Sequence, residues 1–503
     1  MALERSTGLS ELAGFGFIDL DKAQQKLSTL SEQLATPESK LLEPIGNTQD
    51  PDQCLELLVR LTRDHGSKLR TISSNSAAFV RLCKVLGASV GLFDYISRQP
   101  AELELFLLEP ELPKLDASLK VLFDAASSVS SIRVAYRHQL LKIAIFDLSS
   151  HDPAGAIGDV AEALADLAAA AIEAGLSLAR KELADEANPV NFPKQEIANT
   201  RIAVIGMGKC GAGELNYISD VDVIYVAEPL SDELDTDRAL EIATKVCTRM
   251  MRIMDGPDSE PALWQVDANL RPEGKAGALV RSLDSHKTYY ERWAESWEFQ
   301  ALLKARPIAG DTELGNQYLA VTQPKVWEST ARENFVESVQ RMRQLVTDNI
   351  PIHEVDSQIK LGPGGLRDIE FTVQLLQLVH GRTDVSLRVR DTLGAISALA
   401  NGGYIAREDG QRFGDHYRFL RLLEHRIQLN QLRRTHLMPT DELARRGIAR
   451  AVALELSASK LIQRWETVKL EVRDLHQQLF YRPLLSAVSG LSHEDLELTS
   501  AQA

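Results

Sequence analysis

The chain has 503 residues, enough for roughly two to four domains, and its 44% apolar and 25% charged residues are typical of a soluble globular protein. The formal net charge of −15 argues against bulk attraction to nucleic acid or to an anionic membrane. No apolar run approaches the roughly 18 residues of a membrane span, and the four scattered cysteines form neither a zinc motif nor a disulfide framework. We therefore expect a soluble protein of the reducing cytoplasm.

The first part of the chain, residues 1–115, has a helical pattern. Leu55, Leu58 and Leu61, for example, recur at three-residue steps, which places them on one face of a helix. The helical pattern continues after residue 115. An alanine-rich amphipathic segment from Ile157 to Leu178 is predicted to cover the sheet that follows it.

Two predicted strands, Ile202–Ile205 and Val223–Val226, enclose a glycine turn and two aspartates. The first strand ends at the turn, which contains Gly206, Gly208 and Gly211. Asp220 and Asp222 precede the second strand, and because side chains alternate faces along a strand, both point the same way. Two carboxylates beside a glycine turn suit a divalent metal ion and a phosphate.

The glycine turn also has the spacing of two known phosphate-binding motifs. The spacing G-x-G-x-x-G matches the dinucleotide-binding fingerprint, but that motif needs a full crossover helix and an acidic residue about 20 positions later. A P-loop needs Ser or Thr after its lysine, whereas Cys210 follows Lys209. A solvated acidic strand end is the simplest alternative. The turn, Ser219, the paired aspartates and the two strands together favour a nucleotidyltransferase-like site.

A further strand is predicted over Leu263–Arg271. Its alternation places Asp267, Asn269 and Arg271 on one face, which supplies a third carboxylate and a cation. A two-metal phosphoryl-transfer site uses such a set of carboxylates, while the alternative is an Asp–Arg pair at a strand end.

Two later segments contain candidate anion-binding residues. A predicted helix over Ser285–Arg306 ends with Lys304 and Arg306, which either bind an anion or complement the helix dipole. A Gly-Pro-Gly-Gly loop then leads into a helix whose first turn contains Arg367 and Glu370. Either the backbone N–H groups at this helix start hold an anion, or Glu370 is an ordinary acid favoured by the helix dipole. The arginines of the helical segment Phe413–Pro439 are interpreted as a solvated face.

Four segments, in this order and spacing, carry a family resemblance: GMGKCGAGELNYISDVDVIYV, VDANLRPEGKAGALV, WEFQALLKARPIAGD and IKLGPGGLRDIEFTVQLLQLVHG. They resemble the bifunctional glutamine synthetase adenylyltransferase/adenylyl-removing enzymes. Members of that family are about twice as long and have two similar nucleotidyltransferase halves. This sequence resembles the N-terminal half, the adenylyl-removase, and the C-terminal adenylyltransferase half is expected to be missing.

The resemblance implies an α+β fold of the nucleotidyltransferase (DNA polymerase β-like) type, with a mixed sheet and all-helical flanking regions. The expected domains are residues 1–115 (helical), 116–325 (catalytic) and 326–503 (helical). The resemblance also implies that Asp220, Asp222 and Asp267 are catalytic and hold Mg²⁺, with two ions expected. Residues matching the family's nucleotide motif are Gly206, Gly208, Lys209, Gly211, Glu214, Asn216 and Ser219. Further candidates for substrate binding are Arg271, Lys304, Arg306, Arg367 and Glu370.

One position departs from the family pattern, because Asn269 stands where an arginine is expected. This change removes one cationic contact to phosphate and leaves the metal chemistry intact. The implied reaction is Mg²⁺-dependent phosphorolysis of adenylylated glutamine synthetase, with phosphate consumed and ADP released. The alternatives are forward AMP transfer from ATP to a protein tyrosine, and an inert module that binds the PII signal protein. Neither nucleic acid nor membrane is an expected partner.

Overall fold

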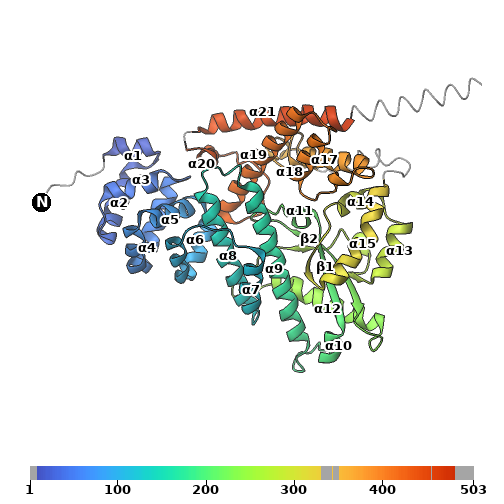
Figure 1. Ribbon diagram of the computed structural model, residues 1–503. Coiled ribbons are helices and arrows are strands. Elements are labelled where there is room, and N and C mark those ends of the chain that lie inside the picture. The colour runs from blue at the N-terminus through green and yellow to red at the C-terminus, as the bar shows by residue number, and fades with distance from the viewer. Residues whose placement is uncertain (1–7, 330–342, 344–349, 455, 482–503) are drawn as a thin grey trace, which may run out of the picture.

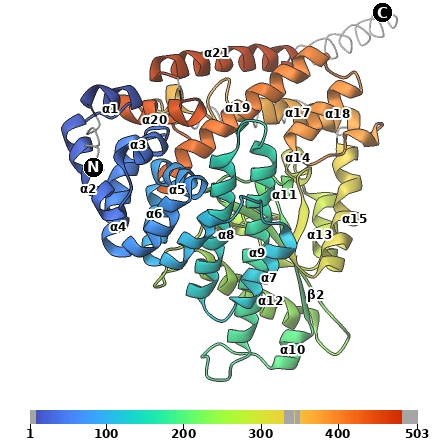
Figure 2. The ribbon, with the colours of Figure 1, turned by 60° about the vertical axis from the view of Figure 1, so that its left-hand side comes forward.

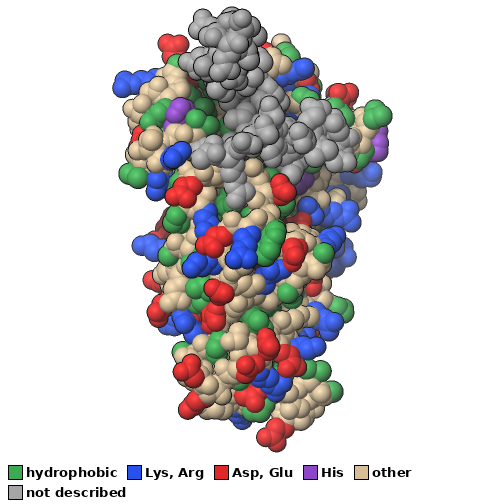
Figure 3. All heavy atoms as spheres, turned by 90° about the vertical axis from the view of Figure 1, so that its right-hand side faces the viewer, with side chains coloured by type: hydrophobic (Ala, Val, Ile, Leu, Met, Phe, Trp, Pro, Cys, Tyr) green, Lys and Arg blue, Asp and Glu red, His purple; other side chains and the backbone are tan. Residues whose placement is uncertain are grey.

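The computed structural model describes residues 8–329, 343, 350–454 and 456–481 (Figure 1). Helices surround one small sheet, as expected for the α+β class (Figure 2). Basic and acidic side chains are interspersed over the described surface shown in Figure 3.

The N-terminal region is helical, as predicted, and polar side chains begin its helices. Asn75 caps the start of one helix and Ser89 the start of the next, each accepting a hydrogen bond from a backbone N–H three residues later. The helices are α1 (Leu9–Phe15), α2 (Leu20–Leu34), α3 (Glu38–Gly46), α4 (Pro51–Ser74), α5 (Ser76–Ala88) and α6 (Val90–Arg98). Among the described residues, no single helix is long and apolar enough to cross a membrane; α5 and α6 pass that test only as a pair bent by 119°.

The sheet is mixed, with strand order β3-β2-β1-β5, and β4 pairs with β2. Its strands are β1 (Thr200–Gly206), β2 (Val221–Pro229), β3 (Val266–Asp267), β4 (Val280–Arg281) and β5 (Arg306–Gly310). β1 is antiparallel to β2 and β5, while β2 is parallel to β3 and β4. The strand predicted over Leu263–Arg271 is therefore only two residues long, because the chain turns away after Asp267.

Each face of the sheet is covered by helices. On one face, Val221 and Val223 of β2 share a core with α9, which confirms the predicted cover of the sheet by that helix. The helices on this side are α7 (Leu115–Asp124), α8 (Val129–Ser149), α9 (Ile157–Leu183), α10 (Lys194–Ala198) and α12 (Thr236–Asp255). On the other face, Ile224 and Val226 join a second core. Its helices are α13 (Leu283–Arg292), α14 (Ser296–Leu302) and α15 (Thr312–Glu328).

The prediction of a single helix over Ser285–Arg306 is wrong. The structure breaks it between α13 and α14, because Glu295 and Glu298 form a capping box that starts a new helix. Trp293, at the break, is 62% exposed. Arg306 then begins an edge strand, so it does not lie at a helix end.

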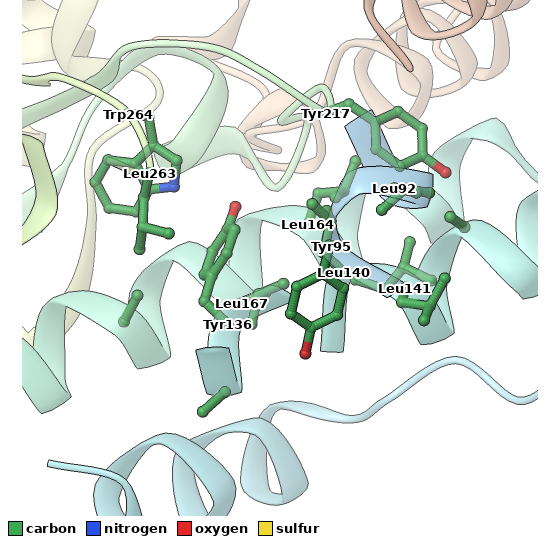
Figure 4. Close-up of a cluster of buried hydrophobic side chains, with 14 of the residues drawn as sticks. Leu92, Tyr95, Tyr136, Leu140, Leu141, Leu164, Leu167, Tyr217, Leu263 and Trp264 are labelled. Atoms are coloured by element: carbon green, nitrogen blue, oxygen red, sulfur yellow. The ribbon is translucent and has the colours of Figure 1, made fainter. Parts of the chain in front are cut away.

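One apolar core joins the N-terminal helices to the sheet. Figure 4 shows Tyr95 of α6, Tyr136 of α8 and Leu164 of α9 in the same cluster as Tyr217 and Trp264. The core is therefore continuous across residue 115, where a domain boundary is expected.

The C-terminal helices have their own core but also contact the rest of the molecule. They are α17 (Leu366–Gly381), α18 (Thr392–Asn401), α19 (Arg407–Gln431), α20 (Glu442–Val452) and α21 (Ala458–His476). Leu429 of α19 belongs to the core of the N-terminal helices. Arg450 of α20 donates a hydrogen bond to the Thr48 carbonyl at 3.0 Å, so α20 contacts the N-terminal helical region (Figure 1).

Candidate active site

Two carboxylates lie side by side at one edge of the sheet. Asp222 of β2 and Asp267 of β3 are direct partners in the parallel register, so their side chains share a face. Asp222 packs on the glycine turn: a Cβ on Gly208, whose φ is +52°, would lie 2.5 Å from Asp222 Oδ2. Burial, followed by repulsion from Asp267, raises the pKa of Asp222 to about 6. The predicted juxtaposition of carboxylates on two strands is thus present for this pair.

The remaining predicted carboxylate, Asp220, is paired with a protein cation. Its Oδ2 lies 2.7 Å from Nη1 of Arg434, and Asp267 Oδ1 accepts a hydrogen bond from the Asn269 backbone at 2.7 Å. Among residues 8–329, 343, 350–454 and 456–481, no three His, Cys, Asp or Glu side chains are grouped to hold a metal ion. The adjacent carboxylates of Asp222 and Asp267 still supply the oxygen ligands that Mg²⁺ prefers. The three-carboxylate metal site therefore stays a prediction.

Lys209 lies on the short helix α11 (Gly208–Ala212) and is buried among protein partners. Its Nζ is 2.8 Å from Glu424 Oε2 and 3.2 Å from Asn216 Oδ1. Arg421 Nη1 also contacts Glu424, at 2.6 Å. Burial opposes ionisation of Glu424, but the charges of Lys209 and Arg421 hold its pKa well below the usual value. Lys209 and Asn216 thus attach the glycine turn to α19.

A second buried network centres on Glu214, which follows α11. Lys304 Nζ lies 2.7 Å from Glu214 Oε2, while the Thr392 backbone and the Tyr417 hydroxyl donate to Oε1 at 2.5 and 3.2 Å. Glu214 and Lys304 are predicted to bind substrate, yet both side chains are buried against α18 and α19. Their observed contacts are those of a structural connection between the sheet and the C-terminal helices.

The remaining predicted residues are dispersed around this edge. Arg271 donates to the carbonyls of Ala268 and Gly277, at 2.8 and 3.2 Å, and so closes its own loop. Arg306 contacts the Cys210 carbonyl at 3.2 Å on the α9 side of the sheet. Gly206 and Gly211 meet closely, because a Cβ on Gly211 would overlap the Gly206 carbonyl oxygen. Ser219 is partly buried, next to Asp220.

The candidate cations for an anionic substrate are Lys360, in the loop before α17, and Arg367, in its first turn. The Lys360 backbone is fixed next to Arg367, because the Arg367 backbone N–H donates to the Lys360 carbonyl at 2.9 Å. Arg367 in turn lies 3.7 Å from Glu370, and its Nε is buried without a hydrogen-bond partner. Both positive charges lower the pKa of Asp222. Within the described ranges, the Lys360 amine has no carboxylate at ion-pair distance.

Sequence reasoning missed Lys360, Glu424 and Arg434. Lys360 is the second residue of the IKLGPGG motif, so its place beside Arg367 in a recognised segment is a signal that could have found it. Glu424 and Arg434 belong to the segment interpreted as a solvated helix face, and nothing local marks them. That interpretation is wrong for Arg421 and Arg426, which are 1% and 2% exposed, because they pair with buried acids.

Comparison with known proteins finds similarity to one family over nearly the whole chain. The family model described as glutamate-ammonia ligase adenylyltransferase matches residues 79–321. A protein of Leifsonia xyli subsp. xyli, named bifunctional glutamine synthetase adenylyltransferase/adenylyl-removing enzyme, is 49% identical over 98% of this chain and 50% of its own length. The chain belongs to this family.

Other members agree with this assignment. Proteins of the same name from Streptomyces avermitilis and Streptomyces coelicolor are each 46% identical, over 98% and 99% of the chain. These matches cover 49% and 50% of the two relatives, so the chain spans about half the length of the curated relatives it matches. The model described as GlnD PII-uridylyltransferase matches residues 337–480.

Proposed function

We propose that this chain removes AMP from an adenylylated tyrosine of glutamine synthetase by phosphorolysis and releases ADP. The observation that carries the proposal is the adjacent pair of Asp222, which packs on the glycine turn, and Asp267; the positive charges of Lys360 and Arg367 also lower the pKa of Asp222. Two carboxylates beside two cations suit a reaction in which both the attacking group and the attacked group are phosphates. The motif order of the family's N-terminal half supports removal of AMP, and the names of the relatives include both activities.

The proposed step needs no protein nucleophile. Inorganic phosphate attacks the adenylyl phosphorus in line, a new P–O bond forms, and the bond to the tyrosine oxygen breaks, so that ADP and tyrosinate are the products. The phenol has a pKa near 10, which makes tyrosinate a moderate leaving group. Lys360 and Arg367 bind and orient the phosphate, and catalysis consists of positioning and charge neutralisation.

Asp222 and Asp267, with Asp220 once Arg434 releases it, would hold the two expected Mg²⁺ ions. When bound, Mg²⁺ would neutralise charge on the phosphate oxygens.

The proposal also includes a competing activity and two protein partners. The same carboxylates serve AMP transfer from ATP to a tyrosine, so the forward reaction is the competing activity. The match of residues 337–480 to a PII-uridylyltransferase model supports the PII signal protein as a partner. The adenylyltransferase half found in the longer relatives is proposed as a second partner.

The test uses two separate incubations of the full chain with Mg²⁺. One contains phosphate and adenylylated glutamine synthetase, and the other contains ATP and unmodified glutamine synthetase. We expect ADP release in the first only, and a loss on the order of 100-fold or more in Asp222→Asn. Asp232→Asn, at an exposed loop position, is the matched control. Turnover in the ATP incubation alone, or full activity of Asp222→Asn, would contradict the proposal.

A further inference from the structure

A cavity of about 740 Å³ lies at the opposite end of α11 from the carboxylate pair. Asp222 packs on Gly208, at the start of α11, whereas the cavity is lined by Gly211 and Gly213 at its end. The two places also lie on different strands of the sheet: Asp222 and Asp267 are on β2 and β3, whereas the cavity is lined by Arg306 of β5 and by residues of both α9 and α15. The neighbours of Asp222 along β2 point into the α9 core, so Asp222 points away from α9; Arg306, which lines the cavity, pairs with Asp166 of α9 at 3.4 Å.

Four arginines line this cavity: Arg306, Arg388, Arg390 and Arg421, of which Arg421 is already paired with the buried Glu424. Arg388 is fixed, because its guanidinium lies 5.0 Å from the Trp327 ring centre and Nε donates to the Gly381 carbonyl at 2.9 Å. Arg390 is exposed to the cavity and, among the described residues, has no carboxylate at ion-pair distance. Burial and then repulsion from Arg306 lower the pKa of Arg390. Both guanidinium groups belong to residues that line the cavity.

The other walls indicate what else the occupant contains. The first turn of the 27-residue helix α9 opens into the cavity, and no side chain caps it. Asp159 and Glu162, on the same wall, are exposed, and their carboxylates are able to accept hydrogen bonds from hydroxyl groups of an occupant. Leu393 and Trp327 supply apolar surface, and a cavity of this volume fits a small organic molecule.

We propose that this cavity is a second binding site, for a small hydroxylated organic anion whose phosphate or carboxylate group contacts Arg306 and Arg390. The cavity is connected through α11 to the edge of the sheet that carries Asp222 and Asp267, here called the reaction edge. Arg306 Nη2 donates to the Cys210 carbonyl at 3.2 Å, and Cys210 is the neighbour of Lys209 in that helix. An anion on Arg306 therefore acts on the element that carries the glycine turn, which makes the cavity a place where a metabolite regulates the reaction.

The test is isothermal titration calorimetry on the full chain at low salt, with glucose 6-phosphate, citrate and inorganic phosphate as separate probes. We expect glucose 6-phosphate or citrate to bind, and Arg390→Gln to weaken that binding by about tenfold, because one charge-assisted contact is lost. Arg412→Gln is the matched control, since Arg412 is an exposed arginine of α19 whose nearest carboxylate is 3.7 Å away. Asp222→Asn should bind the same probe as tightly as the wild type.

Three outcomes would overturn the proposal. In the first, none of the three probes binds the wild-type chain; in the second, Arg390→Gln binds as tightly as the wild type. In the third, Asp222→Asn weakens binding as much as Arg390→Gln does, which would assign the probe to the reaction edge. Inorganic phosphate binding as tightly as the organic probes would likewise exclude a site for an organic anion. No adenylylated substrate is needed, so the result is independent of the proposed phosphorolysis.

Discussion

The buried pair of Lys209 and Glu424 allows a quantitative test of how the glycine turn is held. Both side chains are less than 10% exposed, and three polar oxygens surround the Lys209 amine at 2.8 to 3.2 Å. In Lys209→Met, Glu424 keeps Arg421, so we expect a loss of about 3 kcal/mol in the free energy of unfolding, the lower end for a broken buried pair. In Glu424→Gln, Lys209 and Arg421 both lose their counter-charge, and the loss should approach about 5 kcal/mol.

The assay is a double-mutant cycle, in which the urea unfolding of each variant is monitored by circular dichroism. The double variant should lose less than the sum of the single losses, with a coupling energy of about 2 to 3 kcal/mol. The exposed pair Arg412–Asp409, 3.7 Å apart, is the control and should couple by less than about 0.5 kcal/mol. A coupling energy as small as that of the control pair, together with a large rise in KM in Lys209→Met, would refute the structural role. Lys209 would then be assigned to substrate binding.

Two further predictions concern pH and the phosphate cation. Burial lowers the pKa of His286 from 6.5 to about 4, so the folded state binds fewer protons than the unfolded state between these values. Lowering the pH from 6.5 to 5 should therefore reduce the free energy of unfolding by about 2 kcal/mol, as measured by urea midpoints. His286→Phe should remove this loss, and the exposed-site control His151→Asn should retain it. Equal pH slopes in the wild type and both variants would contradict this prediction. Lys360→Gln should raise the KM for phosphate by about tenfold or more, with Lys287→Gln as the exposed control, and an unchanged KM would remove Lys360 from the site.

Local sequence patterns are sufficient for β1, β2 and the carboxylate pair, but not for β4 and β5. The apolar runs of β1 and β2 mark buried strands, and the two-residue period fixes the face of Asp222. The same patterns do not identify the partners of Lys209 and Lys304. Glu424 lies 215 residues after Lys209, and Thr392 lies 88 residues after Lys304, so these contacts depend on how α18 and α19 pack. Charged residues there resemble a solvated helix face until the fold buries them.

Helix α19 makes the reaction edge and the C-terminal helices one structural unit. Gln428 accepts hydrogen bonds from the Asn216 side chain at 2.7 Å and from the Ile218 backbone at 3.2 Å. These two contacts fix the loop that leads directly to Asp220. Since buried polar groups are costly when unpaired, the nucleotidyltransferase sheet needs α19 to satisfy this loop. The expected boundary near residue 325 therefore separates two sequence regions whose side chains together build one site.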